Sequence, residues 1–472
     1  MRRFLAVFII HACAFTCYAQ PQRPQINDYI REQSPVIALE HVRVIDGTGA
    51  AAKLDQTIVI ANGKIAAIGA SGSMAIPADA KRLDFTGHSA LPGLVGMHDH
   101  LFYPAGGTLY HDMPFTFPRL YLALGVTTIR TTGSIEPYLD LEMKDGIDQG
   151  KFGGPKINVT GPYLEGAGAL TRQMHQLRDP EDARRTVEYW IAEGARSFKA
   201  YNVLTRAELK AAIDAAHQHG IKVTGHLCSI GFREAADLGI DNLEHGLTVD
   251  TEFFPDKKPD VCPNPTQAVI AANKLDVNGP EIQQTIKTLV QHHVAVTSTL
   301  PVFEQLVAAR PDVPQKVLDA LSDDARKAYL ANRARIAQSK ESPWPVMFQK
   351  EMEFERAFVK AGGTLMAGLD PTGIGGVIAG YGDHREVELL VEAGFTPLEA
   401  IKIASLNGAQ FLGEDQHIGS LAVGKQADIL LVKGDPSTKI ADIENVEIVF
   451  KDGIGWDSKR LVESVKGQVG IR

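Results

Sequence analysis

The 472-residue sequence contains only four cysteines and, beyond position 20, no long hydrophobic run. The low cysteine content excludes a fold that depends on several disulfides. Cys13 and Cys17 lie before position 20, so only Cys228 and Cys262 remain, and an oxidising compartment would allow them to pair. No stretch after position 20 is long and apolar enough to be a transmembrane helix.

The sequence also lacks an excess of basic residues. Its formal net charge is −9 and its pI is about 5.9, which excludes the basic surface of a nucleic-acid-binding domain. No Gly-x-Gly-x-x-Gly motif follows an expected strand, so a dinucleotide-binding fold is also excluded. The composition, with 44% hydrophobic and 22% charged residues, is that of an ordinary globular protein. We therefore expect a small-molecule substrate and no nucleic-acid partner.

The amino-terminal segment has the three parts of a secretory signal peptide. Arg2 and Arg3 form a basic start, an apolar run extends to Cys17, and Ala19 is a small residue at its exit. We expect residues 1–19 to be a signal peptide cleaved after Ala19, and the mature protein to be periplasmic or secreted without membrane attachment. An uncleaved membrane anchor is the alternative interpretation.

The two ends of the remaining chain share one pattern. Residues 20–34 are polar, contain prolines and are typical of a linker. Residues 35–87 consist of short alternating apolar runs, two of them joined by an Asn-Gly pair that favours a hairpin. Residues 413–472 repeat this style in ADILLVKGDP and VEIVFKDG. We therefore expect a composite β-sandwich domain built from both ends, with residues 88–412 inserted as a second domain.

The central part of the chain alternates between short apolar runs and helical patterns such as LTRAELKAAIDAAHQHG. This alternation predicts an α/β fold. Eight βα units favour a (β/α)₈ TIM barrel, although the number of strands alone does not exclude a doubly wound open sheet. The eight expected strands are HSALPGLVGMHDH, GVTTIRTTG, KINVTGPYL, RSFKAYN, IKVTGHL, IDNLEHG, HVAVTSTL and GTLMAGLD.

Side chains that can bind a metal stand at the ends of five expected strands. Catalytic groups of a barrel lie at the carboxyl ends of its strands, because these ends and the following loops share one face. Singly, each residue has a simpler interpretation, since a lone histidine is commonly structural, a lysine commonly reaches solvent, and Asp-Pro can start a turn. Together they predict a metal site. The six residues are His98, His100, Lys199, His226, His245 and Asp370.

The residue types indicate how such a site would work. Neutral imidazoles and carboxylates suit Zn²⁺, which we expect, and also Mn²⁺, Fe²⁺ or Co²⁺. Two neighbouring cations need a bridging anion, and a carboxylated Lys199 would supply two negatively charged oxygens. Water bound between two such ions becomes hydroxide near neutral pH. Asp370 could take the proton as general base and later return it, as general acid, to the leaving group.

Three motifs are specific enough to indicate a family. They are LPGLVGMHDH at the first expected strand, NLEHG at the sixth, and GSLAVGKQADILLVKGDP near the carboxyl end. They resemble the amidohydrolase superfamily, and the last is similar to its imidazolonepropionase-like and prolidase-like branch. The resemblance implies two metal ions bridged by carboxylated Lys199. The more buried ion would be held by His98, His100 and Asp370, and the second by His226 and His245.

The resemblance also implies candidate substrate contacts. Tyr201 stands where members that act on dipeptides use a tyrosine to meet the substrate carboxylate, and a packed aromatic residue at the barrel rim is the alternative. His175, after the third expected strand, and His384, after the eighth, are further candidates for contacts with the substrate or the ligands. The connection 101–118 is rich in aromatic residues, which would suit an apolar substrate side chain.

The leading hypothesis is an exported hydrolase with two metal ions that cleaves an amide or peptide bond in a dipeptide or an N-acyl amino acid. The second hypothesis is a hydrolase or deaminase of a cyclic amide, imide, lactone or heterocycle with one ion. Deaminases of the superfamily commonly carry a glutamate three residues after the fifth-strand histidine, whereas Ser229 follows His226 at that spacing. The third hypothesis is a binding protein that uses a degenerate barrel. It conflicts with the sequence, because every expected metal-ligand position is occupied. A homo-oligomer is compatible with the sequence.

Overall fold

The computed structural model describes residues 25–471 of the chain except residues 170 and 340. The expected signal peptide, residues 1–19, lies outside the described residues, so cleavage and export stay predictions. Within the described part of the chain, no helix is both long enough and apolar enough to cross a membrane.

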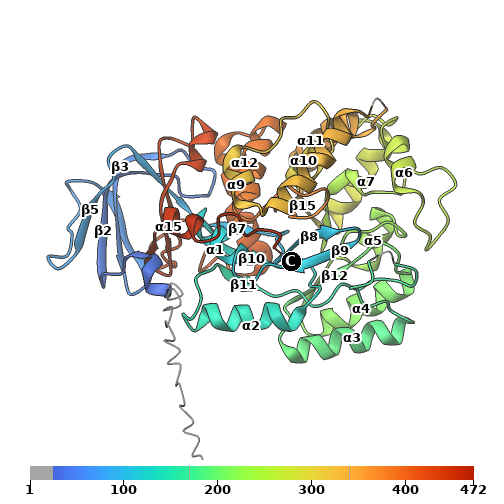
Figure 1. The fold of residues 1–472 in the computed structure, drawn as a ribbon, viewed down its shortest axis with the longest axis horizontal. Coiled ribbons are helices and arrows are strands. Elements are labelled where there is room, and N and C mark those ends of the chain that lie inside the picture. The colour runs from blue at the N-terminus through green and yellow to red at the C-terminus, as the bar shows by residue number, and fades with distance from the viewer. Residues whose placement is uncertain (1–24, 170, 340, 472) are drawn as a thin grey trace, which may run out of the picture.

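A nine-stranded sheet combines strands from the two ends of the chain (Figure 1). The antiparallel pair of β6 and β17 joins the amino-terminal strands to the carboxyl-terminal ones. β3 and β4 are connected at Asn62 and Gly63, which both have positive φ angles, as a tight hairpin turn requires. The strands are β1 (Ile30–Glu32), β2 (Val36–Val44), β3 (Lys53–Ala61), β4 (Lys64–Ala70), β5 (Lys81–Asp84), β6 (His88–Pro92), β17 (Ile429–Lys433), β18 (Val446–Lys451) and β19 (Ile454–Trp456).

The core of this sheet contains side chains from both ends of the chain. Alternate residues of β2, β3, β17 and β18 point into one buried cluster, as the strand period of two predicts. The cluster includes Ile37, Leu39, Ile58, Ile60, Ile429, Leu431, Ile448 and Phe450. The sequence predicted a sandwich of strands from both ends of the chain. In the structure these strands belong to one hydrogen-bonded sheet that packs on this core.

Two strands fall outside the expected domain boundaries. β1 lies in the segment expected to be a linker and pairs with β19. β6 lies in the segment expected to be barrel, because the first expected strand is broken at Gly93. The Gly93 N–H donates to Asp428 O (2.9 Å), and a β-carbon at Gly93 would lie only 2.1 Å from Thr127 Oγ1. The residues before Gly93 therefore belong to the nine-stranded sheet and those after it to the barrel.

Eight parallel strands form the second part of the fold, in the order that the sequence predicts. β7, β10 and β11 form one parallel sheet, and β12 to β16 form another. Backbone hydrogen bonds link the two sheets at both seams, from Arg196 to Val159 O (2.8 Å) and from Met97 to Ala367 O (2.8 Å). The predicted α/β fold of the TIM-barrel type is confirmed. The strands are β7 (Leu94–Gly96), β10 (Val126–Arg130), β11 (Lys156–Asn158), β12 (Ser197–Ala200), β13 (Lys222–Gly225), β14 (Asn242–Glu244), β15 (Ala295–Ser298) and β16 (Leu365–Ala367).

Helices surround these strands, with α2 to α4 on one side and α9 to α12 on the other (Figure 1). α4 begins at a capping box, in which Thr205 and Glu208 accept each other's backbone N–H groups. The α-helices are α1 (Phe117–Ala123), α2 (Pro137–Asp148), α3 (Pro180–Glu193), α4 (Arg206–Gln218), α5 (Phe232–Leu238), α6 (Pro265–Ala272), α7 (Pro280–Gln291), α8 (Leu300–Glu304), α9 (Gln315–Ala320), α10 (Asp323–Ala337), α11 (Trp344–Lys360), α12 (Tyr381–Ala393), α13 (Pro397–Lys402), α14 (Gly408–Leu412) and α15 (Ser458–Glu463). A hairpin of β8 (Phe102–Gly106) and β9 (Leu109–Asp112) lies between β7 and α1.

Candidate active site

The structure brings the six predicted metal-binding residues together at the carboxyl ends of the barrel strands. His98 and His100 follow β7, Lys199 lies in β12, His226 follows β13, His245 follows β14 and Asp370 follows β16. Strand alternation directs Phe198 into the hydrophobic core and the next side chain, Lys199, toward the ring of His98. His245 and Asp370 have φ angles of 67° and 47°, a strained conformation for residues with a β-carbon that is often found at functional sites.

His98, His100 and Asp370 form the tightest group of potential ligands. One ligand atom of each residue lies within 4.8 Å of the other two, and all three side chains are buried. The distances from His98 Nε2 to Asp370 Oδ2 and from His100 Nε2 to Asp370 Oδ1 are both 3.7 Å. Lys199 Nζ lies 2.9 Å from His98 Nε2. A single cation could therefore contact both imidazoles and the carboxylate.

His245 lies next to this group of three ligands, and His226 lies next to His245. His245 Nε2 lies 3.8 Å from Asp370 Oδ2, and the ring centroids of His226 and His245 are 4.5 Å apart. Within the described part of the chain, His245 Nε2 and Asp370 Oδ1 are buried without a hydrogen-bond partner. Buried polar atoms are rarely left unsatisfied, and both atoms would be satisfied by a cation. The donor set therefore fits divalent metal ions.

Hydrogen bonds at Nδ1 orient three of the four imidazoles. Each ring has its Nδ1 held by an oxygen, so its Nε2 faces the centre of the site as the atom available for a metal. The partners are Glu244 Oε2 for His98 (2.8 Å), Thr131 O for His100 (2.8 Å) and Thr299 Oγ1 for His245 (2.6 Å).

Glu244 and Arg130 support the candidate site through hydrogen bonds, and sequence reasoning missed both. Arg130 Nη2 donates to Glu244 Oε1 (2.5 Å), and both side chains are fully buried. Glu244 thus links the guanidinium of β10 to the imidazole of His98. The sequence contains a signal for this role, since Glu244 directly precedes His245 at the end of an expected strand, and charged residues are rarely buried unless paired.

Burial shifts the pKa values of the predicted metal ligands. It lowers the pKa of His98, His100 and His245 well below its usual value, and that of His226 to about 3. Neutral imidazoles are the form that binds metals. Burial also lowers the pKa of Lys199 to about 8 and raises that of Asp370 to about 6.

The three predicted substrate-contact residues have different surroundings. The ring of Tyr201 lies 4.9 Å from that of His226 and 5.8 Å from Lys199 Nζ, so it borders the site. His175 is half exposed, and its Nε2 lies 3.5 Å from Asp182 Oδ2. His384 is buried in α12, where its Nε2 is bound to Leu124 O (2.7 Å). Because this bond directs the ring into the outer layer, the structure does not bring His384 to the metal-binding residues.

Cys228 and Cys262 form a disulfide, with their Cα atoms 4.8 Å apart. Cys228 follows His226 by two residues, so the bond ties the loop after β13 to the connection between β14 and α6. The sequence left this pairing open, because spacing alone does not place two thiols within bonding distance.

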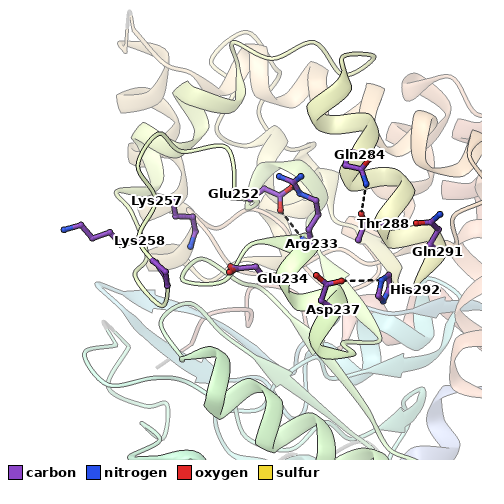
Figure 2. A pocket seen from close by; sticks show the side chains of 11 residues that line it. Arg233, Glu234, Asp237, Glu252, Lys257, Lys258, Gln284, Thr288, Gln291 and His292 are labelled. Atoms are coloured by element: carbon purple, nitrogen blue, oxygen red, sulfur yellow. Dashed lines mark hydrogen bonds and ion pairs between the residues drawn. The ribbon is translucent and has the colours of Figure 1, made fainter.

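A cavity of about 520 Å³ lies on the outer side of the barrel, away from these residues (Figure 2). It is lined by charged side chains of α5 and of the loop after β14, which largely neutralise one another, and by uncharged polar side chains of α7. Arg233 pairs with Glu252 (2.9 Å), and His292 faces Asp237 (3.4 Å). None of the six predicted metal-binding residues lines it, so it is separate from the candidate active site.

Comparisons with known proteins agree with this geometry. A model of the amidohydrolase family matches residues 89–454. The structure of a protein proposed to be a prolidase, from Bifidobacterium longum, is 27% identical and covers 91% of this chain and 98% of its own, with a TM-score of 0.65. A Xaa-Pro dipeptidase with methionine bound in its active site is 20% identical, covers 89% of this chain and 100% of its own with a TM-score of 0.67, and shows the shared fold.

Similarity to curated sequences is confined to short segments. The adenine deaminase of Clostridium botulinum (strain Loch Maree / Type A3) is 37% identical over 76 residues, which are 16% of this chain and only 12% of the deaminase. The imidazolonepropionase of Parabacteroides distasonis is 42% identical over 62 residues, 12% of this chain and 15% of that protein. Because the family model, by contrast, matches more than half of the chain, the chain belongs to the amidohydrolase family, that of metal-dependent hydrolases acting on carbon–nitrogen bonds.

Proposed function

We propose that the protein is an exported amidohydrolase that uses two divalent metal ions to hydrolyse the amide or peptide bond of a dipeptide or an N-acyl amino acid. The convergence of six ligand side chains carries this proposal. His98, His100 and Asp370 would hold the first ion, and His226 and His245 the second. Zn²⁺ suits this set of imidazole and carboxylate ligands.

Lys199 is the residue that favours two ions over one. A lysine ammonium repels cations, whereas its neutral amine can add to CO₂ with loss of one proton and form a carbamate whose two oxygens share one negative charge. Lys199 is 1% exposed, and its Nζ lies 2.9 Å from His98 Nε2, a ligand atom of the first group. A carbamate there would extend the side chain into the space between the two groups of ligands.

The chemistry assigns a proton-transfer role to Asp370. When bound, the ions supply Lewis acidity toward the substrate carbonyl and lower the pKa of a coordinated water. The Asp370 carboxylate faces three imidazoles within 3.8 Å, so it is close to both ion positions. It would receive the proton of the attacking water and deliver it to the leaving nitrogen as the carbon–nitrogen bond breaks.

Export is proposed from the signal-peptide pattern of residues 1–19. The Cys228–Cys262 disulfide supports it, because structural disulfides persist in oxidising compartments such as the periplasm and are rare in the cytosol.

The first test is the metal content of the purified protein, grown with added bicarbonate and measured by elemental mass spectrometry. We expect about two equivalents in the parent, a clear loss in Lys199→Ala, and no loss in the control Lys210→Ala, whose side chain pairs with Asp214 on the surface of α4. One equivalent that Lys199→Ala leaves unchanged would contradict the carbamate.

The short matches to deaminases and to an imidazolonepropionase favour a second candidate, a deaminase or cyclic-amide hydrolase with one ion. The two candidates differ in metal stoichiometry and in substrates. A screen that includes dipeptides, N-acyl amino acids, aminopurines and cyclic amides separates them directly.

A further inference from the structure

Aromatic rings contact the metal-binding histidines from several loops. The ring of Phe102 stacks on His100, with centroids 4.3 Å apart and planes 20° apart. Phe303 lies 5.6 Å from His245 and is itself covered by Trp344. Aromatic surfaces therefore line part of the candidate metal site.

The β8–β9 hairpin presents two aromatic residues toward the site and one away from it. Phe102 pairs with Asp112, and Pro104 with Tyr110, so Phe102 and Tyr110 share one face of the hairpin. Their ring centroids are 5.0 Å apart. Tyr103 lies on the opposite face, where its hydroxyl accepts the Gly376 N–H (2.8 Å). Only one face of the hairpin can therefore meet a substrate.

The hairpin is anchored in this orientation by the loop that follows β11. Gln173 Oε1 accepts the Tyr110 N–H (2.8 Å), and Gln173 Nε2 donates to Tyr110 O (3.0 Å). The neighbouring Met174 and Tyr163 join Phe102 in one buried hydrophobic cluster, against which Tyr110 packs. The two loops thus form one wall beside His100, and Tyr110 is the aromatic residue of this hairpin face that is partly exposed, whereas Phe102 is buried.

We propose that the Phe102–Tyr110 face binds a bulky apolar group of the substrate, so that the preferred substrates carry an aromatic or branched aliphatic side chain next to the scissile amide. This rests on the proposed hydrolysis of dipeptides or N-acyl amino acids. The amide itself is held at the ions, and the group beside it meets the exposed part of the Tyr110 ring, whose burial by an apolar partner is favourable. A glycine or serine at the same place would leave the exposed part of this wall in contact with water.

The test compares three dipeptides, Gly-Gly, Phe-Gly and Gly-Phe. In the parent we expect kcat/KM for at least one phenylalanine peptide to exceed that for Gly-Gly by about tenfold or more, the effect of added apolar contact in a pocket. Tyr110→Ala should lower this ratio by about tenfold and leave metal content unchanged, while Tyr110→Phe should retain it. The control is Phe115→Ala, because Phe115 is exposed and contacts Phe152 instead.

An equal loss of kcat/KM for all three peptides in Tyr110→Ala, or a change of the ratio only in Trp344→Ala, would overturn the assignment of the wall. If no dipeptide is hydrolysed, calorimetric titration with N-acetyl-L-phenylalanine and N-acetylglycine separates the two proposals. Binding of the former alone, weakened in Tyr110→Ala, supports the wall while the hydrolytic proposal fails. Failure of the parent to prefer N-acetyl-L-phenylalanine overturns the wall itself.

Discussion

His98 and Asp99 are neighbours in the chain and both are fully buried, yet they belong to different clusters of ionisable groups. His98 faces the barrel interior with His100 and Asp370. Asp99 faces the outer layer, where it interacts with Asp383 of α12. Burial favours the neutral form in both places, because it lowers the pKa of His98 well below its usual value and raises that of Asp99 well above it. Burial therefore does not distinguish the two clusters.

The arrangement of donor atoms does distinguish them. The outer cluster continues into α11 and α12, where burial raises the pKa of Asp383 to about 7 and that of Glu355 to about 8. Burial thus favours the protonated, neutral form of these carboxyls, and this form does not require a cation. Among the described residues, only His98, His100 and Asp370 offer three ligand atoms that converge on one point. Convergence and the orientation of the imidazoles thus distinguish the inner cluster as the candidate metal site.

The difference between the inner and outer clusters predicts different effects on kcat for the same substitution, aspartate to asparagine, in each cluster. Asp370→Asn should lower kcat by roughly 10²–10⁴-fold, because the amide cannot accept the proton of the attacking water. Asp383→Asn should leave kcat close to that of the parent, since Asp383 caps α12 by accepting the Gly380 N–H. Steady-state kinetics on a hydrolysed dipeptide or N-acyl amino acid measures both, with metal content as the control. A comparable loss of kcat in both variants would show that the two clusters act as one.

The sequence predicted the inner cluster because strand ends follow a simple geometric rule. Once eight parallel strands were expected, His226 and His245 had to share one face with His98. The partners of their Nδ1 atoms could not be predicted in the same way. Thr131 contributes a backbone oxygen and Thr299 a hydroxyl. A threonine at a strand end is common, so it does not indicate such a role.

The errors in the predicted boundaries and contacts have a similar origin. Gly93 divides one apolar run between two domains because of a contact with Thr127, which lies far along the chain. His384 was expected to face the site because it follows Asp370 closely, but helix α12 turns its ring toward Leu124. Contacts between distant parts of the chain determine the boundary at Gly93 and the orientation of His384. Local sequence patterns do not predict such contacts.

Substitution of Glu244 should lower the metal affinity of the inner cluster, although Glu244 itself would not contact the substrate. Glu244→Gln removes the charge that pairs with Arg130 and orients His98, so Arg130 is left as a buried charge without its partner. We expect a 10–100-fold loss in metal affinity, the usual effect of removing a residue that orients a ligand. The free energy of unfolding should fall by about 3–5 kcal/mol. Competition with a metal chelator and urea denaturation measure the two effects, and unchanged metal affinity would contradict the orienting role.

The smallest expected effect concerns the outer cluster and depends on pH. Burial raises the pKa of Glu355 in the folded state to about 8, whereas its ordinary value is 4.5. Folding therefore binds a proton within this window, and the free energy of unfolding falls as the pH rises through it. In Glu355→Gln, which cannot release a proton, the fall between pH 5 and pH 8 should be smaller by at least about 1 kcal/mol, the equivalent of roughly one pKa unit. Glu353→Gln, on the exposed side of α11, should retain the slope of the parent. Urea denaturation across this range decides the matter, and identical slopes in the parent and Glu355→Gln would mean that Glu355 is ionised in the folded protein.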